Sequence, residues 1–169
     1  MPCTTWPRAR KFDCLGPPPL RGDNDHLWGR PNLSKKDQLK VVEGNQLLLV
    51  TLAILNFCTW VLESPWTSRA WLTRPLQHLQ RIASLMKVDY CQFGMPWRKA
   101  TGLLVLPAEC LRPALKICSP KNQRCSASGR KHTVLQGTDT SGQFLTLRAQ
   151  PYPVKLCRAI ACALKSKVS

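Results

Sequence analysis

The stretch Cys58-Thr59-Trp60-Val61-Leu62-Glu63-Ser64-Pro65 decides how this sequence is expected to fold. Its first five residues include β-branched and aromatic side chains, which favour a buried parallel strand. Glu63-Ser64-Pro65 then ends that strand. Because the carboxyl ends of strands carry the chemistry in open α/β sheets, Glu63 is a candidate functional residue.

Helices and further strands are expected on both sides of this strand. Ser34 is expected to cap a helix that reaches about Asn56 and is punctuated at Gly44-Asn45. A second helix is expected from the helical spacing of Leu72, Leu76, Leu79, Ile82 and Leu85. Short strands at 87–91 and 102–106 and a closing helix at 153–164 follow. This alternation of helices and strands predicts an α/β fold.

The N-terminal residues 1–33 and the segment 107–150 differ in composition from the rest of the sequence. Residues 1–33 are rich in Pro, Gly and charged residues and show little apolar periodicity, which predicts a disordered N-terminal arm. Residues 34–169 are then expected to form one α/β domain. Within that domain, 107–150 form an irregular basic loop region.

The charge balance points to a polyanionic partner. The chain has 25 Lys and Arg against 9 Asp and Glu, a net charge of +16. Such a positive field favours nucleic acid first and an anionic membrane second. Nine cysteines without an apolar signal segment at the N-terminus favour a reduced, intracellular chain over a disulfide scaffold. A nucleic-acid partner would extend that location to the nucleus.

An apolar run at 47–62 (LLLVTLAILNFCTWVL) raises the alternative of membrane association. The run has 16 residues and is interrupted by Thr51, Asn56 and Thr59. A membrane-spanning helix needs about 20 apolar residues. A core helix that leads into a buried strand therefore explains the run better, and membrane association stays the less favoured alternative.

Four segments resemble the ordered motifs of a known enzyme family. They are Pro2-Cys3-Thr4-Thr5-Trp6, Val61-Leu62-Glu63-Ser64-Pro65, Phe93-Gly94-Met95-Pro96-Trp97-Arg98-Lys99-Ala100-Thr101 and Ala149-Gln150-Pro151-Tyr152-Pro153. In this order they are similar to the C-terminal part of the DNA (cytosine-5) methyltransferase family, in its divergent phage and mobile-element form. The resemblance implies a partial Rossmann-like sheet of the class I methyltransferase type.

The resemblance also implies roles for individual residues. Cys3 would supply the thiolate that adds to C6 of cytosine, so that C5 accepts a methyl group from S-adenosylmethionine. Glu63 would hydrogen-bond the ring N3 and the exocyclic amine. Arg98 or Lys99 would counter charge at the ring carbonyl or a phosphate, and the base would have to leave the duplex. The alternatives are a terminal thiol at Cys3, a helix-capping carboxylate at Glu63 and a solvated basic turn.

The sequence departs from that family in ways that weaken the expected activity. Ser64 replaces the motif's Asn, Trp97 its Gln, and Lys99 and Thr101 its two Arg residues. No glycine-rich cofactor-binding half precedes Pro2, so no donor-binding residue is assigned. We therefore expect a truncated, mobile-element-derived, methyltransferase-like chain that is inactive alone, unless a complementary chain supplies the donor site. The alternative is a non-catalytic basic fragment that binds nucleic acid by charge.

A second constellation predicts a structural zinc site. Cys118, Cys125 and His132 follow one another at spacings of seven, and Cys91 lies upstream. Zinc takes four sulfur or nitrogen ligands, often from short Cys-x-x-Cys pairs, and no such pair exists here. Ordinary thiols in a loop are the alternative.

Basic residues around this constellation predict contacts with DNA or another nucleic acid. They are Arg98, Lys99, Lys121, Arg124, Arg130 and Lys131. Most of them lie in the loop region where the methyltransferase family places target recognition. Side chains of this kind contact phosphates without reading sequence.

Overall fold

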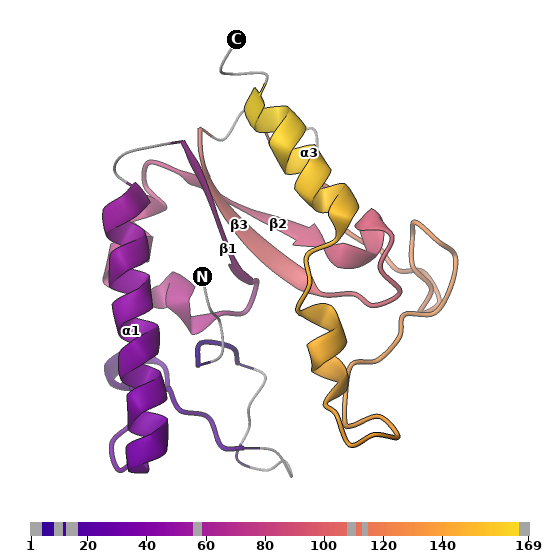
Figure 1. Cartoon of the computed structure of the whole chain (residues 1–169). Coiled ribbons are helices and arrows are strands. Elements are labelled where there is room, and N and C mark those ends of the chain that lie inside the picture. Colours follow the sequence, from indigo (N-terminus) through magenta and orange to yellow (C-terminus); the bar gives the residue numbers. More distant parts are fainter. Residues whose placement is uncertain are drawn as a thin grey trace. The chain divides into compact units, whose positions relative to one another are not determined.

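A computed structural model describes residues 5–8, 12, 17–55, 59–107, 111–112 and 115–165. Its longer elements are the helices α1 (Lys35–Leu55), α2 (Arg74–Leu79) and α3 (Val154–Lys165) and the strands β1 (Trp60–Pro65), β2 (Ser84–Asp89) and β3 (Ala100–Leu106) (Figure 1). Short 3-10 helices are η1 (Asn24–His26), η2 (Arg69–Leu72), η3 (Tyr90–Phe93) and η5 (Leu145–Ala149). The mixture of helices and a sheet confirms the α/β class at this coarse level.

The sheet corrects the expectation of a parallel strand at 58–62. Its three strands lie in the order β1-β3-β2, and the sheet is antiparallel. Strand β1 begins at Trp60 and runs through Pro65, so Glu63 lies within the strand and not beyond its end. Burial alternates along β1, whereas a parallel strand is covered on both faces. The β-branched and aromatic residues favoured a strand here but did not determine its direction.

The chain divides into two compact units. The first comprises Met1–Leu85 with Gly102–Pro107, and the second comprises Met86–Thr101 with Ala108–Ser169.

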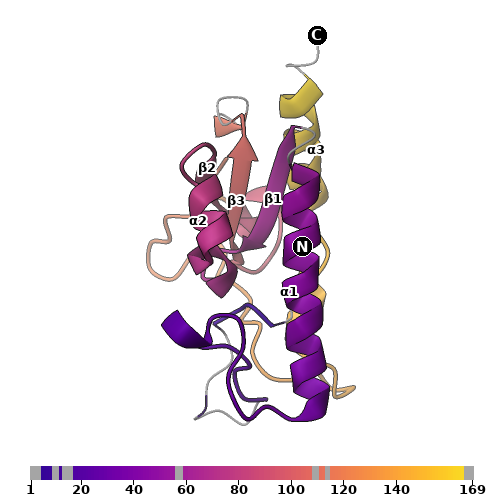
Figure 2. The same cartoon turned by 90° about the vertical axis from the view of Figure 1, so that its left-hand side faces the viewer.

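The core of the first unit includes side chains from the N-terminal arm. Trp6 packs in one apolar cluster with Leu48 of α1 and Leu62 of β1. Figure 2 shows helix α1 beside strand β1. Leu20 is also buried. Part of the described arm is therefore packed in the core, which corrects the expectation of disorder for these residues, whereas Phe12 and Trp28 are exposed.

Arg21 is a fully buried cation in the first unit. Its guanidinium donates to Thr5 Oγ1 at 2.9 and 3.1 Å and to Asn45 Oδ1 at 2.8 Å. It also stacks on Trp6, with Cζ 3.4 Å from the ring centroid. Burial lowers the pKa of Arg21 to about 10, which leaves it charged at neutral pH.

Helix α1 passes through Gly44 without a break. A Cβ atom at Gly44 would lie 2.7 Å from Thr5 Oγ1, so the glycine permits close packing and does not punctuate the helix. Ser34 Oγ accepts from the Asp37 amide at 3.2 Å, which confirms the expected cap. By length and composition alone α1 meets the requirement for a membrane span, a test that a mostly buried core helix also meets. In α1, however, Leu48 is buried while Leu49, Val50 and Ile54 are exposed, so the expected core helix is only partly buried. The run 47–62 belongs partly to α1 and partly to β1.

The long helix expected over 72–85 is wrong. The segment instead forms the end of η2, then α2, and then the first residues of β2. Pro75 lies in the first turn of α2, and Gln80 is the C-cap after only six helical residues. Leu76 is buried while Ile82 is exposed, so the apolar spacing does not mark one helical face.

In the second unit, η3 follows β2 and precedes the turn at Gly94, whose φ of 92° suits glycine. The expected strands at 87–91 and 102–106 correspond to β2 and β3 with shifted ends, and the closing helix corresponds to α3. Within α3, Leu156 is buried, whereas Val154 and Cys157 are exposed.

Candidate metal centre

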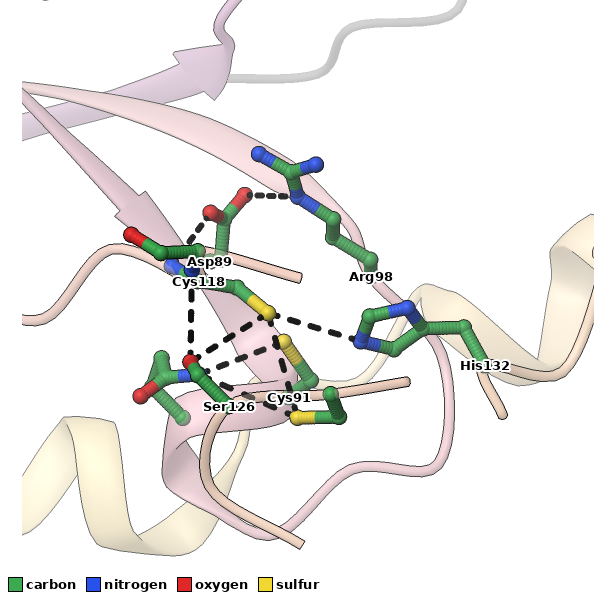
Figure 3. A network of polar contacts seen from close by, with 9 residues as sticks. Asp89, Cys91, Arg98, Cys118, Ser126 and His132 are labelled. Carbon is green, nitrogen blue, oxygen red and sulfur yellow. Dashed lines mark hydrogen bonds and ion pairs between the residues drawn. The ribbon is translucent and has the colours of Figure 1, made fainter. Parts of the chain in front are cut away.

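Four side chains of the second unit converge on one point. Cys91 comes from η3, and Cys118, Cys125 and His132 come from the irregular segment that follows. Their ligand atoms all lie within 4.8 Å of one another. Figure 3 shows the thiol of Cys118 and the ring of His132 turned toward each other. The structure thus brings together the four residues predicted from the sequence, and this Cys3His cluster can hold a metal ion.

The distances within the cluster fit tetrahedral coordination. With Zn–S distances of about 2.3 Å, two sulfurs of a tetrahedron lie about 3.8 Å apart. Cys118 Sγ lies 3.9 Å from Cys125 Sγ and 3.7 Å from His132 Nε2. Cys118 and Cys125 are therefore spaced as ligands of one ion, and their sulfurs are too far apart for a disulfide bond.

Backbone geometry explains how the loop forms a site without a Cys-x-x-Cys pair. Lys121 and Arg124 exchange two backbone hydrogen bonds across a two-residue turn, at 3.2 and 2.9 Å. Asn122 and Gln123 in that turn have φ of 49° and 61°, as in a type I′ hairpin turn. Arg124 also pairs with Lys131, which brings Cys125 beside His132 although His132 lies seven positions later in the sequence.

Several donors surround the sulfur atoms. The Ala127 amide lies 3.4 Å from Cys125 Sγ, and Ser126 Oγ lies 3.6 Å from Cys118 Sγ. Gln92 Nε2 lies 3.8 Å from the sulfurs of both Cys91 and Cys125. Donors of this kind orient thiolate ligands and stabilise their charge.

The environment shifts the thiol pKa values in opposite directions. Burial opposes ionisation of Cys125, but the amides of Ala127 and Ser128, the Ser128 hydroxyl and His132 outweigh it and lower its pKa to about 6. Burial and the neighbouring Cys118 raise the pKa of Cys91 to about 12. A bound cation would favour the thiolate at every one of these cysteines.

Asp89 supports the cluster from the end of β2, and sequence reasoning did not identify it. This fully buried carboxylate accepts from the Cys118 amide at 2.8 Å, and its Oδ1 lies 3.3 Å from Arg98 Nε (Figure 3). The hydrogen bond to Asp89 raises the pKa of Arg98. A lone acid within the strand expected at 87–91, followed by a basic turn, was the only signal of this role in the sequence.

The cationic residues predicted for catalysis make contacts inside the second unit. Arg98 forms the ion pair with Asp89. Lys99 Nζ donates to the Ala149 carbonyl at 3.2 Å and lies 4.7 Å from the centre of the Tyr90 ring. Both residues therefore contact other groups of the second unit, and their role in catalysis stays a prediction.

The other residues predicted for methyl transfer are not assembled into a site within one unit. Cys3 lies outside the described residues. Glu63 is half-buried on β1 of the first unit, whereas Arg98 and Lys99 belong to the second. The remaining predicted basic residues are all exposed on the loop that carries the metal ligands: Lys121, Arg124, Arg130 and Lys131.

Comparison with known proteins assigns no family to this chain. No family model, curated protein or solved structure matches it. The methyltransferase resemblance therefore stays a prediction based on its motifs, while the Cys3His cluster rests on the geometry of the second unit.

Proposed function

We propose that the second unit is a zinc-stabilised structural module in which Cys91, Cys118, Cys125 and His132 bind one Zn²⁺ ion. The convergence of the four ligand atoms within 4.8 Å carries this proposal. Three thiolates and one imidazole form a Cys3His set, which is typical of closed structural zinc sites. Thiolate-rich sites also select zinc over magnesium, calcium and manganese.

The scarcity of other core residues supports a structural role for the metal. Between 115 and 150, where every residue is described, the buried residues are Cys118, Cys125 and Ala149. Two of these three are metal ligands in the proposal, so apolar burial contributes little to ordering this segment. A structural metal stabilises such a segment because it binds only the folded arrangement of its ligands.

Metal analysis of the full chain tests this proposal. The purified chain should contain about one zinc ion, and Co²⁺ in its place should give the thiolate-to-cobalt and d–d absorption bands of tetrahedral sulfur coordination. Cys118→Ser and Cys125→Ser should each weaken or abolish both signals. Cys157→Ser and Cys162→Ser alter exposed cysteines of α3 and serve as matched controls that should retain the metal. Equal loss in all four variants, or no metal in the parent chain, would refute the site.

Cytosine methyl transfer with S-adenosylmethionine stays a separate prediction. It rests on the motifs around Cys3, Glu63, Arg98 and Lys99, and it concerns residues other than the zinc ligands. Thermal unfolding with and without saturating S-adenosylmethionine tests it. A donor-dependent rise in the unfolding temperature would support a cofactor site, because a ligand that binds only the folded state must stabilise it.

A further inference from the structure

The metal-bearing loop arranges three cationic side chains in one row. Antiparallel bridges join Lys121 to Arg124 and Arg124 to Lys131, so Arg124 lies between the two lysines. Residues directly opposite in antiparallel pairs carry their side chains on the same face. All three side chains are exposed. We call Lys121, Arg124 and Lys131 the cation row.

The same backbone presents the metal ligands on its other face. Arg124 immediately precedes Cys125, and Lys131 immediately precedes His132. Successive side chains of extended backbone point to opposite faces. Cys125 is accordingly buried and His132 partly buried, while their cationic neighbours are exposed. Metal coordination would thus fix the backbone from which the cation row projects.

The sequence around the cation row has few acidic residues that could offset the repulsion among its three positive charges. Like charges directly opposite one another destabilise paired strands. The sequence of the second unit has 14 Lys and Arg against three Asp and Glu, and none of the acids lies between 115 and 138. The two acids that the structure describes in this unit, Asp89 and Asp139, already form ion pairs with Arg98 and Arg148.

We propose that the cation row binds the phosphate backbone of nucleic acid, an inference that rests on the proposed zinc site for the rigidity of the loop. Adjacent cations stand on backbones about 4.8 Å apart. Three exposed cations this close together create a local positive field that favours a polyanion such as the phosphate backbone. Arg124 Nη1 donates to the Gly129 carbonyl at 3.1 Å, which holds the guanidinium and leaves other N–H groups for phosphate oxygens.

The chemistry of the loop favours nucleic acid over an anionic membrane. Residues 119–131 contain Ser, Asn, Gln, Lys and Arg, whose side chains hydrogen-bond phosphates and sugars. The same segment has no aromatic, Leu, Ile, Val or Met side chain that could insert into a bilayer. Binding through phosphates alone predicts an interaction that is insensitive to sequence and weakened by salt.

Fluorescence anisotropy with labelled single- and double-stranded oligonucleotides tests the inference on the zinc-loaded full chain. The variant K121Q/R124Q/K131Q should lower the slope of log affinity against log salt by about two to three. The matched control K35Q/K36Q/R81Q removes three exposed charges of the first unit and should keep the parent slope. The charge-preserving variant K121R/R124K/K131R should also keep it, which separates loss of charge from loss of fold.

Three results would overturn the inference. They are an unchanged slope in K121Q/R124Q/K131Q, an equal fall in the control, and binding to vesicles of anionic lipid but to none of the oligonucleotides. Zinc content is measured on the same samples. If zinc is bound and the slope of K121Q/R124Q/K131Q is unchanged, binding of nucleic acid by the cation row is refuted, while the zinc site is still supported. Absence of zinc refutes the zinc site, while the same pair of variants still decides whether the row binds nucleic acid.

Discussion

Asp89 connects the metal cluster to the basic turn through a single carboxylate. One oxygen accepts from the Cys118 amide, and the other lies beside Arg98 Nε. The buried charge is therefore matched by one backbone donor and one guanidinium. Partners of this kind around ligands hold the ligands in position and influence metal affinity.

We expect Asp89→Ala to lower the free energy of unfolding of the zinc-loaded chain by about 1–3 kcal/mol, because the buried Cys118 amide loses its acceptor, whereas Arg98, whose side chain is 34% exposed, can return to water. Zinc affinity should fall by about 10- to 100-fold, as for other residues that position metal ligands. Asp89→Asn retains an acceptor for the Cys118 amide and should lose less zinc affinity. Urea unfolding and competition with a zinc chelator measure the two quantities.

The control for this prediction is Asp23→Ala. Asp23 is half-exposed and pairs with Arg8 and Arg69 at 3.0 and 3.1 Å. Exposed ion pairs contribute about 0–1 kcal/mol to the free energy of unfolding. This change should therefore have little effect on stability, and it should leave zinc affinity unaltered. Equal effects of the Asp89 and Asp23 substitutions on zinc affinity would contradict a positioning role for Asp89.

Asp139 gives a prediction of pH dependence. The Ser141 hydroxyl lies 2.6 Å from Asp139 Oδ1, and this hydroxyl, the Gln143 and Ser141 amides and Arg148 hold the pKa of the carboxyl below its ordinary value of 3.8. A lowered pKa in the folded state means that the contribution of Asp139 is present above its unfolded pKa and is lost as pH falls through the folded pKa. We expect its carboxyl to titrate below pH 3.8 in NMR, and Asp139→Asn to loosen the turn already at neutral pH. Titration at the ordinary value would contradict these contacts.

Individual elements differ in how far their sequence predicted them. Helix α3 and strands β2 and β3 were expected near their observed positions, because each carries a run of suitable propensity. The segment 72–85 was misassigned, because its apolar residues fit a helical spacing, while α2 begins at Arg74, with Pro75 in its first turn, and ends after six residues at the C-cap Gln80. Strand direction depends on partners that are distant in sequence, so the residues of β1 alone did not determine it.

The metal cluster shows which part of a functional site can be predicted from the amino-acid sequence. The three cysteines and His132 were identified because their side chains are metal ligands wherever they lie. Asp89 was missed, because its role depends on a hydrogen bond to the backbone of Cys118, 29 residues away. Contacts of this kind leave no residue pattern, since any amide can be the donor.

The turn of the metal-bearing loop gives a prediction at the scale of the element. Gln123 has φ of 61°, which costs a non-glycine residue about 1–2 kcal/mol. Replacing Gln123 with Gly creates the Asn-Gly pair that type I′ turns prefer. We expect Gln123→Gly to raise the free energy of unfolding by about 0.5–1 kcal/mol, after subtracting the added entropy of the unfolded chain. Thermal unfolding of the zinc-loaded chain measures the change.

Gln150→Gly is the matched control for the turn. Gln150 has φ of −69° and ψ of −45°, an ordinary right-handed conformation. Glycine brings no relief of strain there and should lower stability by about 0.5–1 kcal/mol. If both substitutions lower stability equally, the turn at 121–124 does not have the proposed type I′ geometry.

The two units of the molecule use different sources of stability. The first is built on an apolar cluster that includes Trp6, Leu48 and Leu104. In the second, a cluster of buried residues consists of Cys91, Cys118 and Cys125, which are also metal ligands in the proposal. The first unit should therefore tolerate removal of metal, whereas the segment 115–132 of the second should not, although Val88, Tyr90 and Leu156 of the second unit are buried as well.

Hydrogen exchange on the full chain tests this difference. Adding a strong zinc chelator should make the amides of 115–132 exchange much faster, because hydrogen bonds such as those of Cys125 and Arg124 depend on the loop that the metal holds. Amides of α1 should keep their protection, since their helix packs on the apolar cluster of the first unit. Cys118→Ser should reproduce the pattern without chelator, and Cys162→Ser should not. Equal acceleration in α1 and in 115–132 would mean that the metal stabilises the chain as one cooperative unit. Unchanged protection at 115–132 would mean that backbone pairing alone orders the loop.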